Sequence, residues 1–406
     1  MNNNALLVLT RWPFPSKRGA DIRIVSIMKY LLSKECNLNI VCFFKNKQEF
    51  KSIEVPELIK EAVIHPVYLT ILDKAINVFK SIFRREALQV GLYYKNDLKE
   101  LIYMLSSKST LTVVHLVRLA YLHPHIISNY KLLELTDSMG LNFYSRINNN
   151  KNILINSFSN YIYRREVRLI SQYEADVINY FNSATVVSNR DKNYIVDVSK
   201  QSRMNIHVIP LAFDSYTLDK KSTKNHKELR LGFIGKLGYL PNDQALNYIV
   251  ENLLPLICKE NFLVRLCVIG DIPKDYKYPL NLTKINIEYT GWVDNIYDYL
   301  EDIDVSLAPV FLGSGMQTKI VTSLSCGVPV IASSNLKESH ILNGDNGVLF
   351  FESPGSFLNI LKKFKSDNFR VFQSEEAYKV FKSSYSFDLF SSRFDKLLEG
   401  VFHGYK

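Results

Sequence analysis

One stretch near the C-terminal third of the chain restricts the possible folds more than any other. It reads VSLAPVFLGSGMQTKIVTSLSCGVPVIAS, residues 305–333. Its pattern predicts, in order, a strand over 305–309, a glycine-bearing loop, a helix over 316–326 and a second strand over 330–333. Apolar residues recur on one face of this helix, which can therefore pack on a sheet. The stretch predicts a strand–helix–strand unit of a parallel sheet.

The loop of this stretch has the features of a phosphate-binding site. Gly313 and Gly315 precede a helix whose first turns carry Lys319. Free backbone N–H groups, the positive end of a helix dipole and a cation would then meet at one point, which attracts phosphate. The alternative, which this stretch alone leaves open, is an ordinary crossover whose glycines serve only the turns.

Length and composition indicate a globular protein of two domains. The chain has 406 residues, of which 47% are hydrophobic and 22% charged. It contains no run of eighteen apolar residues, and its start lacks the pattern of a signal peptide. We therefore expect a cytoplasmic protein whose five cysteines are reduced and lie in the core. No cysteine or histidine spacing predicts a metal site.

The net charge of +10 permits anionic partners. Its Lys and Arg residues are spread along the whole chain without a recognisable nucleic-acid module, so we expect no nucleic acid. The most concentrated basic feature is LDKAINVFKSIFRR, residues 72–85, which predicts an amphipathic helix. Such a helix can lie on an anionic membrane, and it can equally be a surface helix of its domain.

Strands and helices alternate through the first half of the chain, which predicts a doubly wound parallel sheet. Polar residues follow several of the predicted strands. The loop after the first strand carries Gly19 and, one turn into the next helix, Arg23; later strand ends carry His115 with Arg118, and Asp137. In such a sheet these ends line one crevice.

The alternation restarts after a polar segment, DSYTLDKKSTKNHK, residues 214–227, which we interpret as a linker. The predicted organisation is an N-terminal domain over 1–213, a C-terminal domain over 228–386, and a final helix within 387–406 that crosses back to the first domain. The fold class is α/β, with two Rossmann-like domains facing a central cleft.

The order of the motifs resembles the GT-B glycosyltransferases, and among them the retaining family-4 (group 1) enzymes of bacterial surface polysaccharide synthesis. The resemblance spans nearly the whole chain. It rests on WPFPSKRGADIR, VHLVRLAY, LELTDSMGLNFYSR, VVSNRDKNYI, VIPLAFD, LGFIGKLGYLPNDQAL, YTGWVDNIYDYL and the stretch described first.

The resemblance implies a role for particular residues in binding a nucleotide-sugar donor. Gly19, Lys236 and Lys319 match positions that face the donor diphosphate, and residues around 290–293 match the nucleoside-binding region. The donor site implied in this way comprises Gly19, Arg23, Gly235, Lys236, Asn242, Thr290, Trp292, Val293, Ser314, Gly315, Met316, Gln317, Lys319 and Thr322. His115, Arg118 and Asp137 are the catalytic candidates, near the transferred sugar and the acceptor. No cofactor and no metal are implied.

Several positions depart from the family pattern, among them Leu211–Ala212, which stand where Asn-Gly is usual before the linker. Ser314 and Thr322 stand where typical members carry two glutamates, and Asn242 stands where a lysine is usual. The loop GYLPNDQA and the helix start GMQTK resemble a branch of the family that tolerates some of these changes. The missing glutamates leave a poorly active or non-catalytic relative as an alternative.

The function implied is transfer of a sugar from a nucleotide-sugar to a glycan, lipid-linked, in capsule, O-antigen or exopolysaccharide synthesis, with peripheral contact at the cytoplasmic face of the inner membrane. A nucleotide-sugar epimerase of the same fold is a second alternative. An NAD-dependent enzyme is disfavoured, because no GxGxxG follows the first predicted strand.

Overall fold

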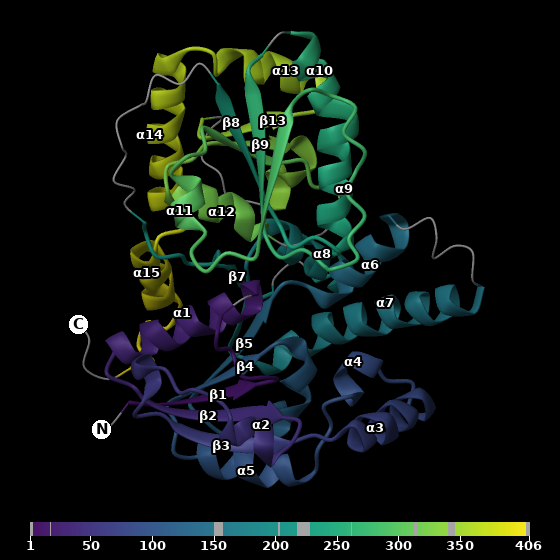
Figure 1. Ribbon diagram of the computed structural model, residues 1–406. Coiled ribbons are helices and arrows are strands. Elements are labelled where there is room, and N and C mark those ends of the chain that lie inside the picture. The colour runs from purple at the N-terminus through teal and green to yellow at the C-terminus, as the bar shows by residue number, and fades with distance from the viewer. Residues whose placement is uncertain are drawn as a thin grey trace. The chain divides into compact units, whose positions relative to one another are not determined.

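The chain forms two compact units. The computed structural model describes residues 3–16, 18–149, 157–201, 204–216, 228–260, 262–311, 316–339 and 346–402. Unit 1 comprises Met1–Ala212 and Phe390–Lys406, and unit 2 comprises Phe213–Leu389. Each is an α/β unit built on its own parallel sheet (Figure 1).

Unit 1 is organised around a seven-stranded sheet with the order β3-β2-β1-β4-β5-β6-β7. All neighbouring strands pair in parallel. The central strands are apolar on both faces, as covered parallel strands are. The strands are β1 (Asn4–Leu9), β2 (Asn37–Phe44), β3 (Val63–Tyr68), β4 (Leu111–His115), β5 (Tyr130–Thr136), β6 (Ser183–Val186) and β7 (Ile206–Val208).

Helices cover this sheet and contribute to its apolar core. The C-terminal helix α15 (Phe387–Leu397) packs on α1 (Gly19–Ser33) through the rings of Phe394 and Tyr30, whose centroids are 5.2 Å apart. The other helices are α2 (Lys47–Lys51), α3 (Ile71–Phe83), α4 (Leu88–Gly91), α5 (Asp97–Ser106), α6 (Met139–Asn149), α7 (Ser157–Val177) and α8 (Asn189–Ser199), with 3₁₀ segments η1 (Glu57–Ile59), η2 (Val117–His125) and η4 (Ile178–Tyr180).

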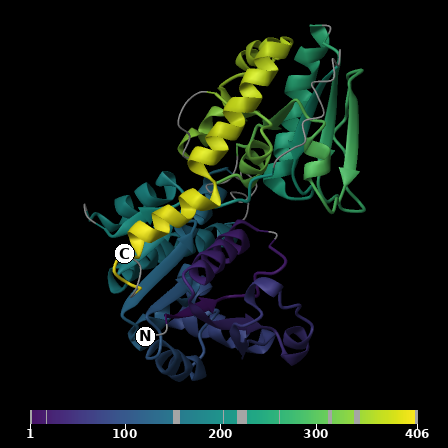
Figure 2. The same ribbon diagram turned by 90° about the vertical axis from the view of Figure 1, so that its left-hand side faces the viewer.

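Unit 2 is organised around a six-stranded parallel sheet with the order β10-β9-β8-β11-β12-β13. Figure 2 shows its long helix α14 (Asp367–Ser384) in yellow. The strands are β8 (Leu229–Ile234), β9 (Val264–Ile269), β10 (Asn286–Gly291), β11 (Val305–Ala308), β12 (Val330–Ser333) and β13 (Val348–Phe351). The other helical segments are α9 (Leu240–Tyr248), η5 (Ile249–Leu253), α10 (Leu254–Lys259), α11 (Tyr297–Leu300), α12 (Thr318–Ser325), η6 (Ser334–Ser339) and α13 (Pro354–Lys363).

The sequence pattern and the structure differ most in unit 2. The sequence pattern after β8 predicts a helix over 243–257. The observed helix begins earlier, at Leu240, and is interrupted by the π-helical segment Ile249–Leu253 ahead of Pro255. The pattern also predicts a helix over 294–302 before β11, which the structure reduces to the single turn α11. The sequence pattern did not predict β13, α13 and α14. The expectation of core cysteines is wrong for Cys258, which is exposed, while the other four are buried and free.

The described part of the chain contains no helix with the length and apolar character needed to cross a bilayer.

Candidate functional site

In unit 2, the loop after β8 brings its backbone close to the side chain of Asn242. A Cβ placed on Gly235 would lie 2.8 Å from the Cγ of Asn242, so only glycine leaves room for that amide. Asn242 is buried near the start of α9, and its side-chain NH₂ donates to the carbonyl oxygen of Lys236 at 2.8 Å. The glycine and the asparagine therefore fix the shape of this loop together.

Lys319 reaches this loop from α12. Its ammonium donates to the Oδ1 of Asn242 at 2.7 Å and lies 5.0 Å from the centre of the Phe233 ring. Burial lowers the pKa of Lys319 to about 7. The structure thus joins two predicted donor residues that lie 77 positions apart in the chain. It also gives Asn242 two partners within unit 2, the Lys319 ammonium and the Lys236 carbonyl oxygen.

The other predicted donor residues of the first loop and of the end of β10 are more exposed. Lys236 forms a solvent-exposed ion pair with Asp271 at 2.8 Å. Trp292 is 62% exposed and follows the end of β10, whereas Val293 packs on a small apolar cluster. Thr290 donates its hydroxyl to the carbonyl oxygen of Gly291 at 2.9 Å. Because β8 and β10 lie in one parallel sheet, their carboxyl ends share an edge.

The glycine loop of the opening stretch lies mostly outside the described residues, and the predictions for Ser314 and Gly315 fall there. Met316 is buried, and Gln317 is the residue that precedes the first turn of α12. Thr322 lies one turn beyond Lys319 on the same helix and is partly buried. The helix begins two residues later than the sequence pattern predicted.

In unit 1, the ends of β4 and β5 carry an unusual backbone conformation. Leu116 has a φ of 71° and Thr136 a φ of 63°. Positive φ is costly for residues with a Cβ and more so for a β-branched one, and such residues concentrate at functional sites. His115 and Asp137, two of the predicted catalytic residues, are their immediate neighbours.

His115 is 4% exposed at the end of β4. One of its ring nitrogens, Nε2, lies 3.4 Å from the hydroxyl of Thr136. Burial, followed by the nearby cations Arg11, Arg23 and Arg118, lowers the pKa of His115 to about 3. The ring is therefore neutral at physiological pH and can act as a hydrogen-bonding group.

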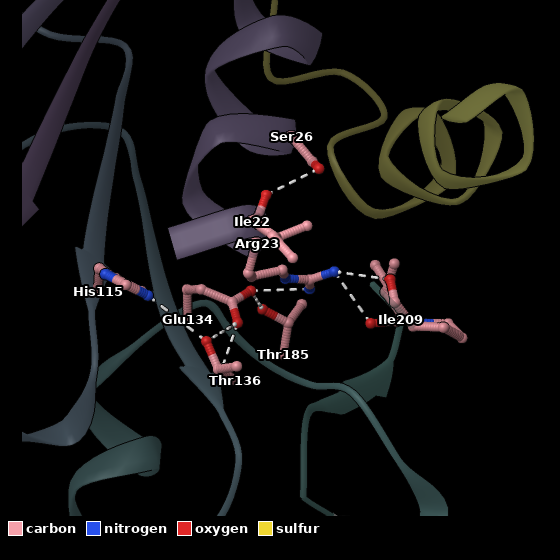
Figure 3. A network of polar contacts seen from close by, with 9 residues as sticks. Ile22, Arg23, Ser26, His115, Glu134, Thr136, Thr185 and Ile209 are labelled. Atoms are coloured by element: carbon pink, nitrogen blue, oxygen red, sulfur yellow. Dashed lines mark hydrogen bonds and ion pairs between the residues drawn. The ribbon is translucent and has the colours of Figure 1, made fainter. Parts of the chain in front are cut away.

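Arg23 is corrected from a donor-binding residue to a structural one. Its side chain is fully buried, and its guanidinium pairs with Glu134 at 2.8 Å and donates to the carbonyl oxygens of Ile209 and Pro210 (Figure 3). It also lies 5.1 and 5.4 Å from the centres of the Phe390 and Phe394 rings. With no exposed surface, it has nowhere to meet a ligand.

Arg118 and Asp137 remain catalytic candidates, and their surroundings restrict their side chains. The guanidinium of Arg118 donates to Gln89 at 3.1 Å and lies 5.7 Å from the centre of the Tyr93 ring. Burial lowers its pKa. The pKa of Asp137 is raised by burial and by the neighbouring carboxyl groups of Asp191 and Glu134. Gly19 is the first residue of α1 and is partly exposed.

Sequence reasoning missed the buried carboxyl groups that shape this region. Glu174 accepts hydrogen bonds from the backbone N–H groups of Met139 and Gly140 at 2.6 and 3.0 Å, at the start of α6. Asp191 accepts the N–H of Ser138 at 2.9 Å. The sequence did contain a signal for one of these groups. Glu134 lies inside an apolar strand, where a buried carboxyl group requires hydrogen-bonding or charged partners. Among the described residues, no cluster of three or more His, Cys, Asp or Glu side chains could hold a metal ion.

Comparison with known proteins finds a family match in unit 2. Residues 228–367, within unit 2, match the family model of glycosyl transferases group 1. No curated protein sequence matches the chain.

Solved structures show the same fold along the whole chain. Sucrose-phosphate synthase from Thermosynechococcus elongatus superposes with a TM-score of 0.68 at 11% identity, covering 98% of this chain and 99% of that one. Anabaena Alr3699/HepE in complex with UDP-glucose gives 0.61 at 11% identity, with 97% and 99% covered. The lipopolysaccharide outer core galactosyltransferase WaaB gives 0.62 at 12% identity, with 98% and 100% covered.

The matched region contains Lys236, Asn242 and Lys319, so the family match and the best-connected part of the candidate site coincide. Unit 2 therefore carries the sequence match to glycosyl transferases group 1, and the whole chain has the GT-B fold of its structural neighbours.

Proposed function

We propose that the protein transfers a sugar from a nucleotide-sugar donor to a glycan acceptor, with Lys319 facing the donor diphosphate. The observation that carries the proposal is the bond of the Lys319 ammonium to Asn242 next to the loop after β8. Two solved structures of similar fold contain UDP or UDP-glucose, which supports a nucleotide-sugar as donor here.

The proposed chemistry follows from charge. As the glycosidic bond to the donor breaks, negative charge develops on the leaving nucleoside diphosphate. A cation and backbone N–H groups held in place beforehand stabilise that charge without reorganising. Lys319 and the residues at the start of α12 would provide these groups, with Lys236 as a second cation. We propose that no metal takes part.

The environment of Lys319 suggests that binding of a diphosphate takes up a proton. Burial lowers the pKa of Lys319 to about 7, so its amine loses its proton much more readily than that of an exposed lysine. A bound diphosphate favours the charged ammonium, because opposite charges raise the pKa of an amine. We therefore expect affinity for nucleoside diphosphates to fall as the pH rises above 7.

Calorimetry with UDP, GDP, ADP and dTDP tests this proposal. Titrations in buffers with different ionisation enthalpies measure the proton uptake for whichever nucleotide binds. Lys319→Met should abolish the uptake and weaken binding by at least about tenfold, as loss of a charge-assisted contact implies. Lys362 lies on α13 and pairs with Glu260, and Lys362→Met is the matched control. It should change neither the proton uptake nor the affinity. Undiminished binding by Lys319→Met would exclude the assigned role.

The acceptor, the stereochemistry and the location are further parts of the proposal. We propose a lipid-linked acceptor in capsule, O-antigen or exopolysaccharide synthesis, retention at the anomeric carbon, and a position at the cytoplasmic face of the inner membrane. His115, Arg118 and Asp137 would contact the transferred sugar or the acceptor. Incubation of the protein with a bound nucleotide-sugar alone separates transfer from epimerisation, because only an epimerase alters the sugar without an acceptor.

A further inference from the structure

Helix α3 of unit 1 exposes its apolar face to solvent, which is the reverse of a normal surface helix. Six of its large apolar side chains point to solvent and form what we call the outer face of α3. Their exposed fractions are 85% for Ile71, 69% for Leu72, 44% for Ile76, 63% for Phe79, 52% for Ile82 and 72% for Phe83. Surface helices normally bury such a face and expose their polar one.

The polar face of α3 is the one that contacts the protein. The side-chain amide of Asn77 donates to the carbonyl oxygens of Leu92 and Tyr94, at 3.4 and 2.8 Å. Ser81 is 1% exposed, and a Cβ placed on Gly91 would lie 1.6 Å from its Oγ. The helix therefore packs closely on α4 through small and polar groups. Figure 1 shows the two helices side by side. Its orientation is fixed by specific contacts.

The start of α3 is equally well defined. Thr70 and Asp73 form a reciprocal capping box, in which each side chain accepts the backbone N–H of the other residue. Capping of this kind satisfies N–H groups that the first turn leaves free. The helix that bears the outer face is thus held in place both at its first turn and along the polar face that contacts the protein.

The charges around the outer face indicate its partner. At 100° per residue, Lys74 and Lys80 fall on the two borders of the apolar face, and the exposed Arg84 and Arg85 follow its last residue. A second copy of the chain placed on this face would bring like charges together. A lipid surface with anionic headgroups would instead receive the apolar side chains in its acyl layer and the cations in its headgroup layer.

We propose that the outer face of α3 is a membrane-binding surface that inserts into bilayers containing anionic lipids. The proposal is independent of donor binding in unit 2. It specifies which surface of the chain would bring the enzyme to a lipid-linked acceptor.

Co-sedimentation of the full chain with vesicles tests this surface. The protein should bind vesicles of phosphatidylcholine mixed with phosphatidylglycerol at least about tenfold more strongly than vesicles of phosphatidylcholine alone, and lose this preference in high salt. Phe79→Glu/Phe83→Glu should reduce binding at least about tenfold, because it places charge where apolar insertion is required. Lys80→Gln/Arg85→Gln should reduce the preference for phosphatidylglycerol.

A matched control distinguishes this face from general exposure of apolar residues. Leu280 and Leu282 in unit 2 are 75% and 85% exposed, so Leu280→Glu/Leu282→Glu should leave vesicle binding unchanged. Circular dichroism verifies that all variants are folded. The proposal is overturned by a wild type that does not bind anionic vesicles or by equal binding of Phe79→Glu/Phe83→Glu. Lipid-independent self-association that this double variant abolishes would overturn it too, by assigning the face to a second copy.

Discussion

At the scale of single residues, the two units use buried charge in different ways. In unit 1 the pair of Arg23 and Glu134 is fully buried, and each partner is held by further contacts (Figure 3). Glu134 also accepts hydrogen bonds from the N–H and hydroxyl of Thr136 and from the hydroxyl of Thr185. In unit 2 Lys319 has a neutral amide as its partner. The first arrangement pairs two opposite charges, whereas the second pairs a titratable amine with a neutral group.

The buried pair yields a prediction for stability. Glu134→Gln leaves the Arg23 guanidinium buried without a counter-charge, and we expect a loss of about 3–5 kcal/mol in the free energy of unfolding of unit 1. Glu57→Gln removes a partner from the exposed pair with Lys60 and should cost less than about 1 kcal/mol. Urea denaturation followed by circular dichroism compares the two. Equal losses would contradict the structural role given to Arg23.

At the scale of elements, helix starts in unit 1 are held by carboxyl groups from neighbouring helices. Glu174 on α7 accepts the N–H groups of the first two residues of α6, and its other donor is the Ser138 hydroxyl at 2.8 Å. Burial is the largest influence on its pKa and raises it to about 7. Its carboxyl group therefore binds a proton on folding in the range between its ordinary pKa and 7.

This proton uptake gives a second prediction. A carboxyl group with a raised pKa stabilises the folded state at a pH below its unfolded pKa, and this contribution is lost as the pH rises through about 7. Glu174→Gln cannot titrate, so its free energy of unfolding relative to the wild type should increase between pH 5 and 7.5, by at most about 1.4 kcal/mol per pH unit. Denaturation series at several pH values measure the slope. A constant difference would show that Glu174 is already ionised throughout.

At the scale of the whole molecule, the chain returns to its first unit at the C-terminus. Phe390 and Phe394 of α15 are 3% and 1% exposed and belong to unit 1. The carboxylate of Asp395 accepts the Tyr30 hydroxyl at 2.9 Å and pairs with Lys34 at 2.8 Å. Unit 2, in contrast, is one continuous stretch, Phe213–Leu389.

This connectivity predicts separate effects of truncation. A chain ending at residue 389 loses buried aromatic side chains that each contribute about 3–5 kcal/mol, as well as the rings over Arg23, so unit 1 should be strongly destabilised. Unit 2 should keep its unfolding transition. Calorimetric scans of this chain and of one ending at residue 402 compare the two. A shared loss of both transitions would indicate that the units unfold together.

The sequence by itself determined the alternation of strands and helices, because apolar periodicity is a local property. It predicted β12 at its observed bounds, and its motifs resembled the family whose model matches residues 228–367. It did not predict the π-helical segment after α9, since a π-helical turn leaves no clear mark on apolar periodicity.

Only the tertiary structure decided which polar residues meet. Arg23 looked like a ligand-binding residue because the sequence does not show that Glu134, 111 positions later, and the carbonyl oxygens near residue 209 surround it. Asn242 looked like a replaced lysine until α12 brought Lys319 to its amide. The orientation of α3 has the same origin. The sequence shows that α3 is amphipathic. It does not show which face contacts the protein, because that depends on residues 91–94, to which the polar face is bound.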